Sequence, residues 1–293
     1  MKTYPDFDYL ARIKYAFSLN TSKKTSNILE GDFRSIYRGR SMEFDELGEY
    51  TQGDNVRDID WKASSKADTI LVRRYTAERK HNILFVCDRG VKMLADTSGG
   101  EPKSRLAVLC LGTAAYLCDR AGADYSCLRA SESGYELDLF RSGTNHLENI
   151  IMRYSAEIGQ ESGTSVLSLL EHAASDIKKR QIIVLITDIE GIRQMTQQLI
   201  SEVNIKNDLL VMNIDDAYLT DKNSFDVSLR RYASTFIPDS RELEKFEKNI
   251  RQQILDKAKK LFDTYRVGFV TVSREEEIID KTLALFRRDN LRK

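Results

Sequence analysis

Residues 181–187, QIIVLIT, decide the fold, because they form the most strand-like run in the chain. A second unbroken apolar run lies at 82–87, NILFVC, and each run is followed directly by an aspartate, Asp188 and Asp88 respectively. Continuous apolar strands are typical of a parallel sheet that is covered on both faces. We therefore expect two central parallel strands at 82–87 and 181–187.

Strands and helices alternate on both sides of these two runs. We expect helices near 103–121, 145–158, 166–179, 192–203, 243–265 and 275–288, and strands at 124–130, 135–140, 208–214 and 267–272. The gap between the first two of these strands is too short for a crossover, so they form an antiparallel hairpin. The alternation predicts an α/β fold with a doubly wound, mostly parallel six-stranded sheet. The polar connection at 215–240 is unusually long and is the best candidate for a mobile or partner-contacting loop.

A charged stretch at 38–80 precedes the first central strand and contains the only tryptophan of the chain, Trp61. Its acids and bases alternate, and arginine–carboxylate hydrogen bonds are the strongest of the charge-assisted type. We therefore expect the stretch to fold as a structural charged clamp, with Trp61 buried as its anchor. The residues of this clamp are Arg40, Glu43, Asp45, Tyr50, Asp54, Arg57, Asp60, Trp61 and Arg73.

Local patterns divide the N-terminal part further. Apolar residues at helical spacing predict a short amphipathic helix at 6–19. Turn-forming residues at 51–54 and a strand-like composition at 69–77 predict β structure inside the charged stretch. We expect an N-terminal unit at 1–80, made of this helix and a β-containing extension, and a larger domain at 81–293.

The charged stretch also carries a long motif, RG-x-x-x-EFDELGEY-x-x-GD-x-VRDIDWKAS, which is followed by the strand residues VRRY. In these features the chain resembles the bacterial domain-of-unknown-function family 58, whose members have a von Willebrand A-like domain. The sequence departs from the family pattern at Ser41, Gly48, Gln52 and Asn55, where the family usually shows glycine, arginine, proline and aspartate. The resemblance implies a Rossmann-like six-stranded sheet in the order 3-2-1-4-5-6, with strand three antiparallel.

The resemblance also implies a site at the carboxyl ends of the central strands, where open α/β sheets bind ligands. Von Willebrand A domains hold a metal ion there through Asp-x-Ser-x-Ser, a threonine in a Gly-Thr turn and a further aspartate. This chain matches at Asp88, Thr164 and Asp188, whereas Gly90 and Lys92 replace the two serines. Mg²⁺ prefers six oxygen ligands, and Lys92 brings a positive charge of its own. We expect a degenerate site without a cofactor; bound Mg²⁺ is the alternative.

The partner, too, is implied by the resemblance: a MoxR-type AAA+ ATPase. With it the protein would act as a non-enzymatic adaptor in the maturation or remodelling of protein complexes, on a client that the sequence does not identify. We expect the partner-binding residues at the carboxyl-end face of the sheet, with the connection at 215–240 beside them. They are Asp88, Lys92, Thr164 and Asp188.

A metal-dependent hydrolase or nuclease is the alternative function. It would use either the crevice between Asp88 and Asp188 or the stretch containing Asp54, Asp60 and Lys62, a loose form of the pattern by which some nucleases hold Mg²⁺ and a lysine near a phosphate. The stretch lacks a basic groove, and no His-containing acid–base set or phosphate loop is present. Arginine-paired aspartates at Asp58 and Asp60 are the stronger interpretation.

Composition limits the remaining possibilities. The 293 residues include 45 Lys plus Arg and 45 Asp plus Glu, so no bulk charge favours a nucleic-acid partner. No apolar run reaches the ~20 residues of a membrane span, and the N-terminus lacks the pattern of a secretory leader. We expect a cytoplasmic protein whose four cysteines, Cys87, Cys110, Cys118 and Cys127, are buried free thiols.

Overall fold

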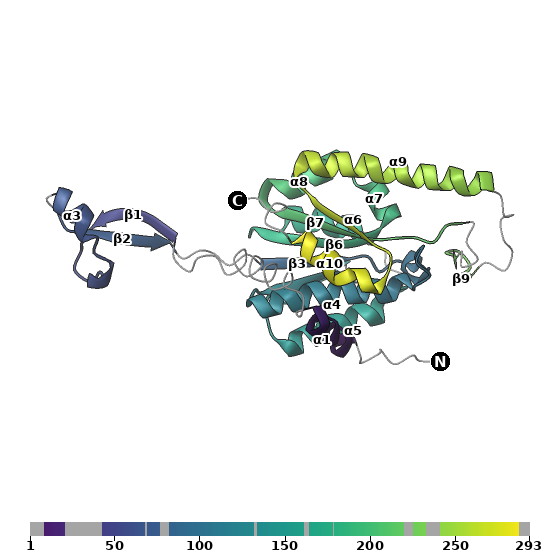
Figure 1. The fold of residues 1–293 in the computed structure, drawn as a ribbon, viewed down its shortest axis with the longest axis horizontal. Helices are drawn as coiled ribbons and strands as arrows, with labels where there is room; N and C mark the ends of the chain where they lie inside the picture. Colours follow the sequence, from purple (N-terminus) through teal and green to yellow (C-terminus); the bar gives the residue numbers. More distant parts are fainter. Residues whose placement is uncertain are drawn as a thin grey trace.

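A six-stranded sheet forms the centre of the computed structural model (Figure 1). The structure describes residues 9–20, 43–67, 69–76, 82–131, 134–160, 164–177, 179–219, 225–232 and 241–286. The sheet order is β10-β7-β6-β3-β4-β5, and β5 alone in this sheet is antiparallel to its neighbour. Counted along the chain this is the expected order 3-2-1-4-5-6, which is thereby confirmed. The strands are β3 (Asn82–Cys87), β4 (Tyr125–Ser131), β5 (Gly134–Leu137), β6 (Gln181–Asp188), β7 (Asp208–Ile214) and β10 (Gly268–Val272).

The two central strands, β3 and β6, pair in parallel with a register that aligns their carboxyl ends. Asn82 lies opposite Gln181 at one end and Cys87 opposite Ile186 at the other. The chain then continues the pairing for one more bond, from the amide of Asp88 to the carbonyl of Ile186 at 2.8 Å. The aspartates that follow the two strands are consequently delivered to the same edge of the sheet.

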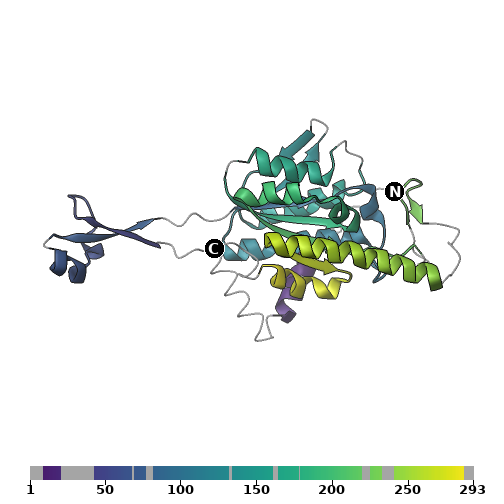
Figure 2. The ribbon, with the colours of Figure 1, turned by 90° about the horizontal axis from the view of Figure 1, so that it is seen from above.

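Helices cover both faces of the sheet (Figures 1 and 2). Apolar side chains divide into two buried clusters, one on each face, because successive residues of a strand point to opposite sides. One face is covered by α1 (Tyr9–Asn20), α4 (Lys103–Ala121), α5 (Thr144–Glu157) and α10 (Ile278–Leu285). The other is covered by α6 (Val166–Ser175), α7 (Ile189–Gln194), α8 (Gln197–Lys206) and α9 (Arg241–Tyr265). All four cysteines are buried and free, as expected.

The prediction of one helix near 192–203 is wrong, because two helices, α7 and α8, lie there and are separated at Met195 and Thr196. The hydroxyl of Thr196 accepts a hydrogen bond from the Leu199 amide at 3.2 Å and caps α8. Likewise, α6 ends at Ser175 rather than at 179. The threonine cap is a local signal that apolar periodicity does not register.

The N-terminal helix α1 packs against α4. Ile13 and Phe17 are buried in the same cluster as α4, and a Cβ on Gly112 would lie only 2.5 Å from Cδ1 of Ile13. Gly112 therefore allows the two helices to approach closely. Arg12 also donates two hydrogen bonds, at 2.8 and 2.9 Å, to the carboxylate of Glu275. Through these contacts α1 belongs to the packed body, although its sequence precedes the charged stretch.

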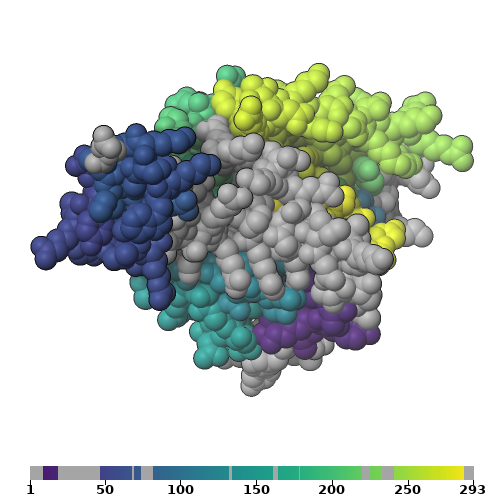
Figure 3. Space-filling view, turned by 60° about the vertical axis from the view of Figure 1, so that its left-hand side comes forward, coloured from purple at the N-terminus to yellow at the C-terminus, as the bar shows by residue number. Residues whose placement is uncertain are grey.

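The described part of the charged stretch, which we call the arm (residues 43–67 and 69–76), has its own small sheet. β1 (Glu43–Glu49) and β2 (Leu71–Thr76) pair antiparallel, and η1 (Val56–Asp58) and α3 (Trp61–Ala67) fill the connection. In Figures 1 and 2 the arm lies apart from the central sheet, and Figure 3 shows it at the left of the molecule, with α9 along the upper edge. The expected β structure is confirmed; α3 is an element that the sequence analysis did not anticipate.

The expectation that Trp61 is a buried anchor is wrong. Trp61 is the first residue of α3 and is 66% exposed. The arm is too small to surround an indole, and the residues that join α3 to β2 are polar: Ser64 Oγ donates to the Asp60 carbonyl at 2.8 Å and accepts from the Leu71 amide at 2.8 Å. Backbone and hydroxyl hydrogen bonds, rather than a buried tryptophan, join these segments of the arm.

Candidate functional site

Lys92 connects the ends of the two central strands. Its Nζ lies 2.9 Å from Oδ2 of Asp88 and 2.8 Å from Oδ1 of Asp188. The short helix η2 (Val91–Leu94), which follows β3 directly, brings the lysine back across the edge of the sheet. One ammonium group thus sits between the two carboxylates that the parallel register brings together.

Asp88 is held in place by three contacts besides Lys92, two to its carboxylate and one to its backbone. The Thr187 hydroxyl donates to its Oδ2 at 3.0 Å, and the Gly90 amide donates to its Oδ1 at 3.0 Å. In addition, the buried Tyr154 hydroxyl donates to the Asp88 backbone carbonyl at 2.7 Å. These hydrogen bonds restrict the rotamer of the Asp88 carboxylate.

A second lysine, Lys103, binds Asp188 from inside the protein. Its Nζ lies 2.7 Å from Oδ2 of Asp188 and also bonds the carboxylate of Asp216, while its side chain is wholly enclosed. Asp188 in turn caps α7 by accepting from the Gly191 amide at 3.2 Å. The sequence analysis missed Lys103 and Asp216. A lysine that opens an apolar helix, rather than closing it, was the available signal.

These contacts lower the pKa of Asp188 and raise the pKa values of Lys92 and Lys103. Burial alone would raise the pKa of Asp188, but Lys103 and Lys92 outweigh it and lower the pKa to about 2. Burial would lower the pKa of each lysine, yet their carboxylate partners raise both. For Asp216 burial prevails over Lys103, so its pKa is raised. The result is a closed charge network in which ammonium groups neutralise the carboxylates.

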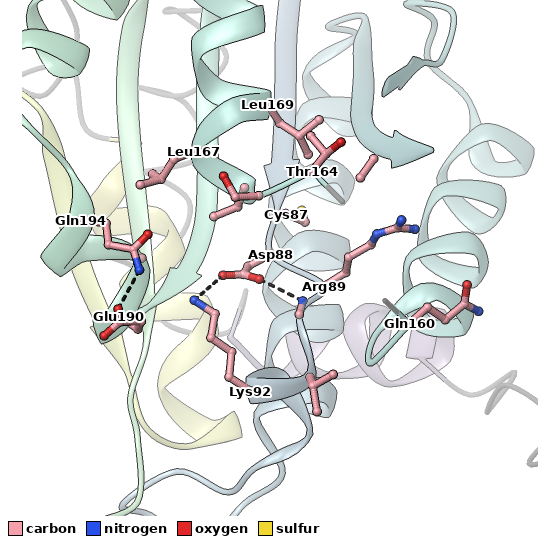
Figure 4. A pocket seen from close by; sticks show the side chains of 16 residues that line it. Cys87, Asp88, Arg89, Lys92, Gln160, Thr164, Leu167, Leu169, Glu190 and Gln194 are labelled. Atoms are coloured by element: carbon pink, nitrogen blue, oxygen red, sulfur yellow. Dashed lines mark hydrogen bonds and ion pairs between the residues drawn. The ribbon is translucent and has the colours of Figure 1, made fainter. Parts of the chain in front are cut away.

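A cavity of about 360 Å³ opens beside this network (Figure 4). Asp88 and Lys92 lie on one wall, and Thr164 lies on another at the start of α6. The Thr164 hydroxyl donates to the Gly134 carbonyl at 3.0 Å. Asp188 does not line the cavity but contacts it through Lys92. The other lining residues are Cys87, Arg89, Gly90, Val91, Ala130, Gln160, Ser165, Val166, Leu167, Leu169, Glu190, Gly191 and Gln194.

The residues at this edge do not fit a divalent metal ion. Mg²⁺ requires about six oxygen ligands, whereas the space between Asp88 and Asp188 holds the ammonium group of Lys92. The Thr164 hydroxyl donates its proton to a backbone carbonyl instead of facing the two aspartates. Across the described ranges, no three His, Cys, Asp or Glu side chains converge in a metal-binding group.

The residues expected to form the charged clamp are brought together only in part. Asp60 accepts two hydrogen bonds from Arg73, at 2.9 and 3.0 Å, and these lower its pKa together with the Ala63 amide, whose bond has the largest effect. Tyr50 and Arg57 are exposed, and the carboxylate of Asp58 has no partner that the structure describes. Arg40 and the side chains of Glu43 and Asp45 lie outside the described residues.

The stretch containing Asp54, Asp60 and Lys62 does not form a nuclease-like cluster. The Asp54 carboxylate accepts from the amide and hydroxyl of Thr51, at 2.8 and 2.9 Å. Asp60 caps α3 through the amides of Lys62 and Ala63, at 3.1 and 3.0 Å. The Lys62 side chain is exposed. Each aspartate thus serves its own turn or helix.

The long connection after β7 is held at the same edge of the sheet. The Asp215 amide donates to the Val272 carbonyl at 2.9 Å, and the Ala217 amide donates to the Asp96 carbonyl at 2.9 Å. Arg251 of α9 donates to the carbonyls of Asp216 and Ala217. Further along, β8 (Phe225–Asp226) and β9 (Arg231–Tyr232) form a small hairpin. The described part of this connection lies beside the charge network, where the sequence analysis placed it.

Comparison with known proteins identifies a family. A family model described as "Protein of unknown function DUF58" matches residues 46–254. No match to the chain is found among curated proteins. Within the described residues, none of the helices combines the length and apolar character needed to cross a bilayer.

Similar solved structures include three proteins at low sequence identity. A von Willebrand factor type A protein from Catenulispora acidiphila has 11% identity and a TM-score of 0.39, over 73% of this chain and 43% of its own. The conserved hypothetical protein BatB from Bacteroides thetaiotaomicron has 13% identity and a TM-score of 0.37, over 69% of this chain and 98% of its own. The PilB minor pilin from Streptococcus sanguinis has 12% identity and a TM-score of 0.41, over 74% of this chain and 63% of its own. The chain therefore spans less than half of the first of these proteins.

Proposed function

The chain belongs to the DUF58 family of proteins of unknown function, and from this membership we propose that it is a non-enzymatic protein-interaction module. Its partner is a MoxR-type AAA+ ATPase, and it serves as an adaptor in the maturation or remodelling of protein complexes. The ATPase is proposed from the family resemblance, and the binding mode from the residues at the carboxyl edge of the sheet.

The observation that carries the proposal is the pairing of Asp88 and Asp188 with lysines of the same chain. A general base or a metal-binding carboxylate needs a lone pair directed at a substrate or an ion. Here Lys92, Lys103 and the neighbouring hydroxyl and amide groups use the oxygens of both carboxylates. Such an edge is suited to binding a partner surface rather than to acid–base chemistry.

The cavity beside Lys92 has the character of a docking site for a protein side chain. Leu167 and Leu169 give it an apolar wall, and the exposed amides of Gln160 and Gln194 give it a polar rim. Apolar pockets with a few polar groups at the rim are typical of binding sites on rigid scaffolds. We place the ATPase-binding surface around this cavity, with Asp88, Lys92 and Thr164 in its walls and Asp188 behind Lys92.

The test is binding of the purified chain to a MoxR-type ATPase from the same organism. Biolayer interferometry measures the binding with and without a non-hydrolysable nucleotide. Asp188 is unsuitable for charge reversal, because its enclosed carboxylate holds two lysines. Glu190→Lys on the cavity rim should weaken binding about tenfold or more, with an unchanged thermal melt. Glu202→Lys, at an exposed position of α8, is the matched control and should bind normally.

Two results would contradict the proposal. Equal binding by wild type, Glu190→Lys and Glu202→Lys would move the surface away from the cavity, and failure of the wild type to bind any such ATPase would remove the partner. Mg²⁺-dependent hydrolysis of a phosphodiester such as bis(p-nitrophenyl) phosphate, abolished by Asp88→Asn, would instead support the hydrolase alternative.

A further inference from the structure

The arm exposes large apolar side chains close to one end of its small sheet. Trp61 is 66% exposed, and Tyr50 and Ile70 are also exposed. Backbone hydrogen bonds bring their segments together: the Tyr50 amide donates to the Ile70 carbonyl at 2.8 Å, and the amide just before Trp61 donates to the Leu71 carbonyl at 2.9 Å. Exposed apolar groups gathered in this way mark interaction sites on folded proteins.

The helix that carries Trp61 is rigidly attached to the arm. The Asp60 carboxylate caps α3 and is itself fixed by Arg73 on β2. Ser64 bonds the same strand through its hydroxyl, which accepts from the Leu71 amide. A tryptophan presented on a fixed backbone loses little entropy on binding, and tryptophan is the side chain most enriched among residues that dominate binding energy.

The charges on α3 are all of one sign. Its sequence, WKASSKA, places exposed Lys62 and Lys66 on the same short helix as Trp61 and contains no acid. Neither lysine makes an ion pair with any residue that the structure describes, whereas the nearby acids Asp54 and Asp60 are engaged by Thr51 and Arg73. The surface offered by α3 therefore carries an exposed aromatic ring and two exposed cations that form no ion pair within the described residues.

From this arrangement we infer that α3 is a docking site for an acidic protein segment that carries an apolar side chain. The apolar side chain would pack on Trp61, and carboxylates of the segment would pair with Lys62 and Lys66. This surface is distinct from the cavity at the carboxyl edge of the central sheet, so the inference does not depend on the ATPase proposed above.

The remaining charges of the arm favour a protein over a membrane or a nucleic acid. Glu49 is exposed and Asp58 is half-buried, and neither carboxylate has a partner within the described residues. An anionic lipid surface or a phosphate backbone presents negative charge uniformly. It would attract the two lysines but also repel these two carboxylates. A folded or extended protein segment places its carboxylates at discrete positions and avoids that repulsion.

The test uses the native fluorescence of the chain, because Trp61 is its only tryptophan. In the free full-length protein, acrylamide should quench the emission efficiently. A short synthetic peptide that alternates glutamate with leucine and phenylalanine should shift the emission to the blue and protect it from quenching. The matched peptide with lysine in place of glutamate, and vesicles containing phosphatidylserine, should leave the emission unchanged.

Two variants assign the effect to α3. The double variant Lys62→Glu/Lys66→Glu should bind the acidic peptide with an affinity lower by about thirtyfold or more. Lys206→Glu, at an exposed position of α8, should bind the peptide like wild type. Glu190→Lys at the cavity should also bind the peptide normally, which separates failure here from failure of the proposed function. Emission already protected in the free protein, an equal response to both peptides, no response to the acidic peptide, or a response to vesicles instead would each overturn the inference.

Discussion

The ammonium group of Lys103 lies 2.7 Å from Oδ2 of Asp188, although 85 positions separate the two residues in the chain. Lys103 is the first residue of α4, where the helix dipole disfavours a cation. Its side chain is enclosed, so it depends on Asp188 and Asp216 for compensation. The relationship ties the start of α4 to the ends of β6 and β7.

Lys103→Met is expected to destabilise the protein by about 3 to 5 kcal/mol, because it leaves Asp188 and Asp216 buried with one fewer counterion. Urea unfolding followed by far-UV circular dichroism measures the loss. Adding Asp216→Asn to Lys103→Met should recover part of it, since an amide needs no counterion. Strictly additive losses in the double variant would show that the pair is not coupled.

The wild type is expected to show no rise in melting temperature with Mg²⁺ or Mn²⁺ after chelation, because Lys92 occupies the space between the two carboxylates. Gly90→Ser/Lys92→Ser restores the hydroxyl ligands and removes the ammonium group. A Cβ at position 90 would lie 3.3 Å from Oδ1 of Asp88, which a small shift accommodates. At saturating Mg²⁺ the melting temperature of this variant should rise by about 5 °C or more.

A comparable rise in the wild type would mean that Lys92 gives way to the ion. If the double variant stays unresponsive while it remains folded, the loss of the serines would not explain the loss of metal binding. Lys206→Ser, which removes an exposed lysine of α8, controls for the change in net charge.

Asp188 should make the stability depend on pH in the acid range. Its pKa of about 2 in the folded protein lies below the ~3.9 of an unfolded chain, so its contribution is complete above about pH 4 and is lost as the pH falls towards 2. The size is about 2 to 3 kcal/mol. In Asp188→Asn, the free energy of unfolding should fall less steeply between pH 4 and pH 2, as measured by urea titrations at each pH. Glu202→Gln, on the exposed face of α8, should retain the wild-type slope.

Trp61→Ala should cost less than about 1 kcal/mol of stability, because two thirds of the side chain is already exposed. A buried tryptophan would cost about 3 to 5 kcal/mol. Asp60→Ala, which removes the cap of α3 and the partner of Arg73, should destabilise the arm more than Trp61→Ala does. Hydrogen exchange of the arm amides measures both variants, and the reverse ranking would make Trp61 a core residue.

The doubly wound, mostly parallel sheet could be predicted from the sequence because apolar periodicity is a local property, whereas the order of its strands was implied by the family resemblance. The runs at 82–87 and 181–187, the short gap before β5 and the alternation with helices suffice to define a doubly wound sheet. The positions of Asp88 and Asp188 followed from the same pattern, since parallel strands that align bring their carboxyl ends together. The long motif in the charged stretch indicated the family, which the match at residues 46–254 confirms.

Tertiary structure alone decided which charges meet. Lys103 and Asp216 belong to segments far apart in the chain. A lysine at the start of an apolar helix is an unusual local feature, but the local sequence does not identify the carboxylates that it meets. Trp61 is the opposite case: a lone tryptophan among charges predicts burial, but the arm closes through hydrogen bonds of Asp60 and Ser64 and leaves no core for it. Periodic apolar burial can be read from the chain itself, whereas the pairing of individual charges depends on distances that only the folded molecule sets.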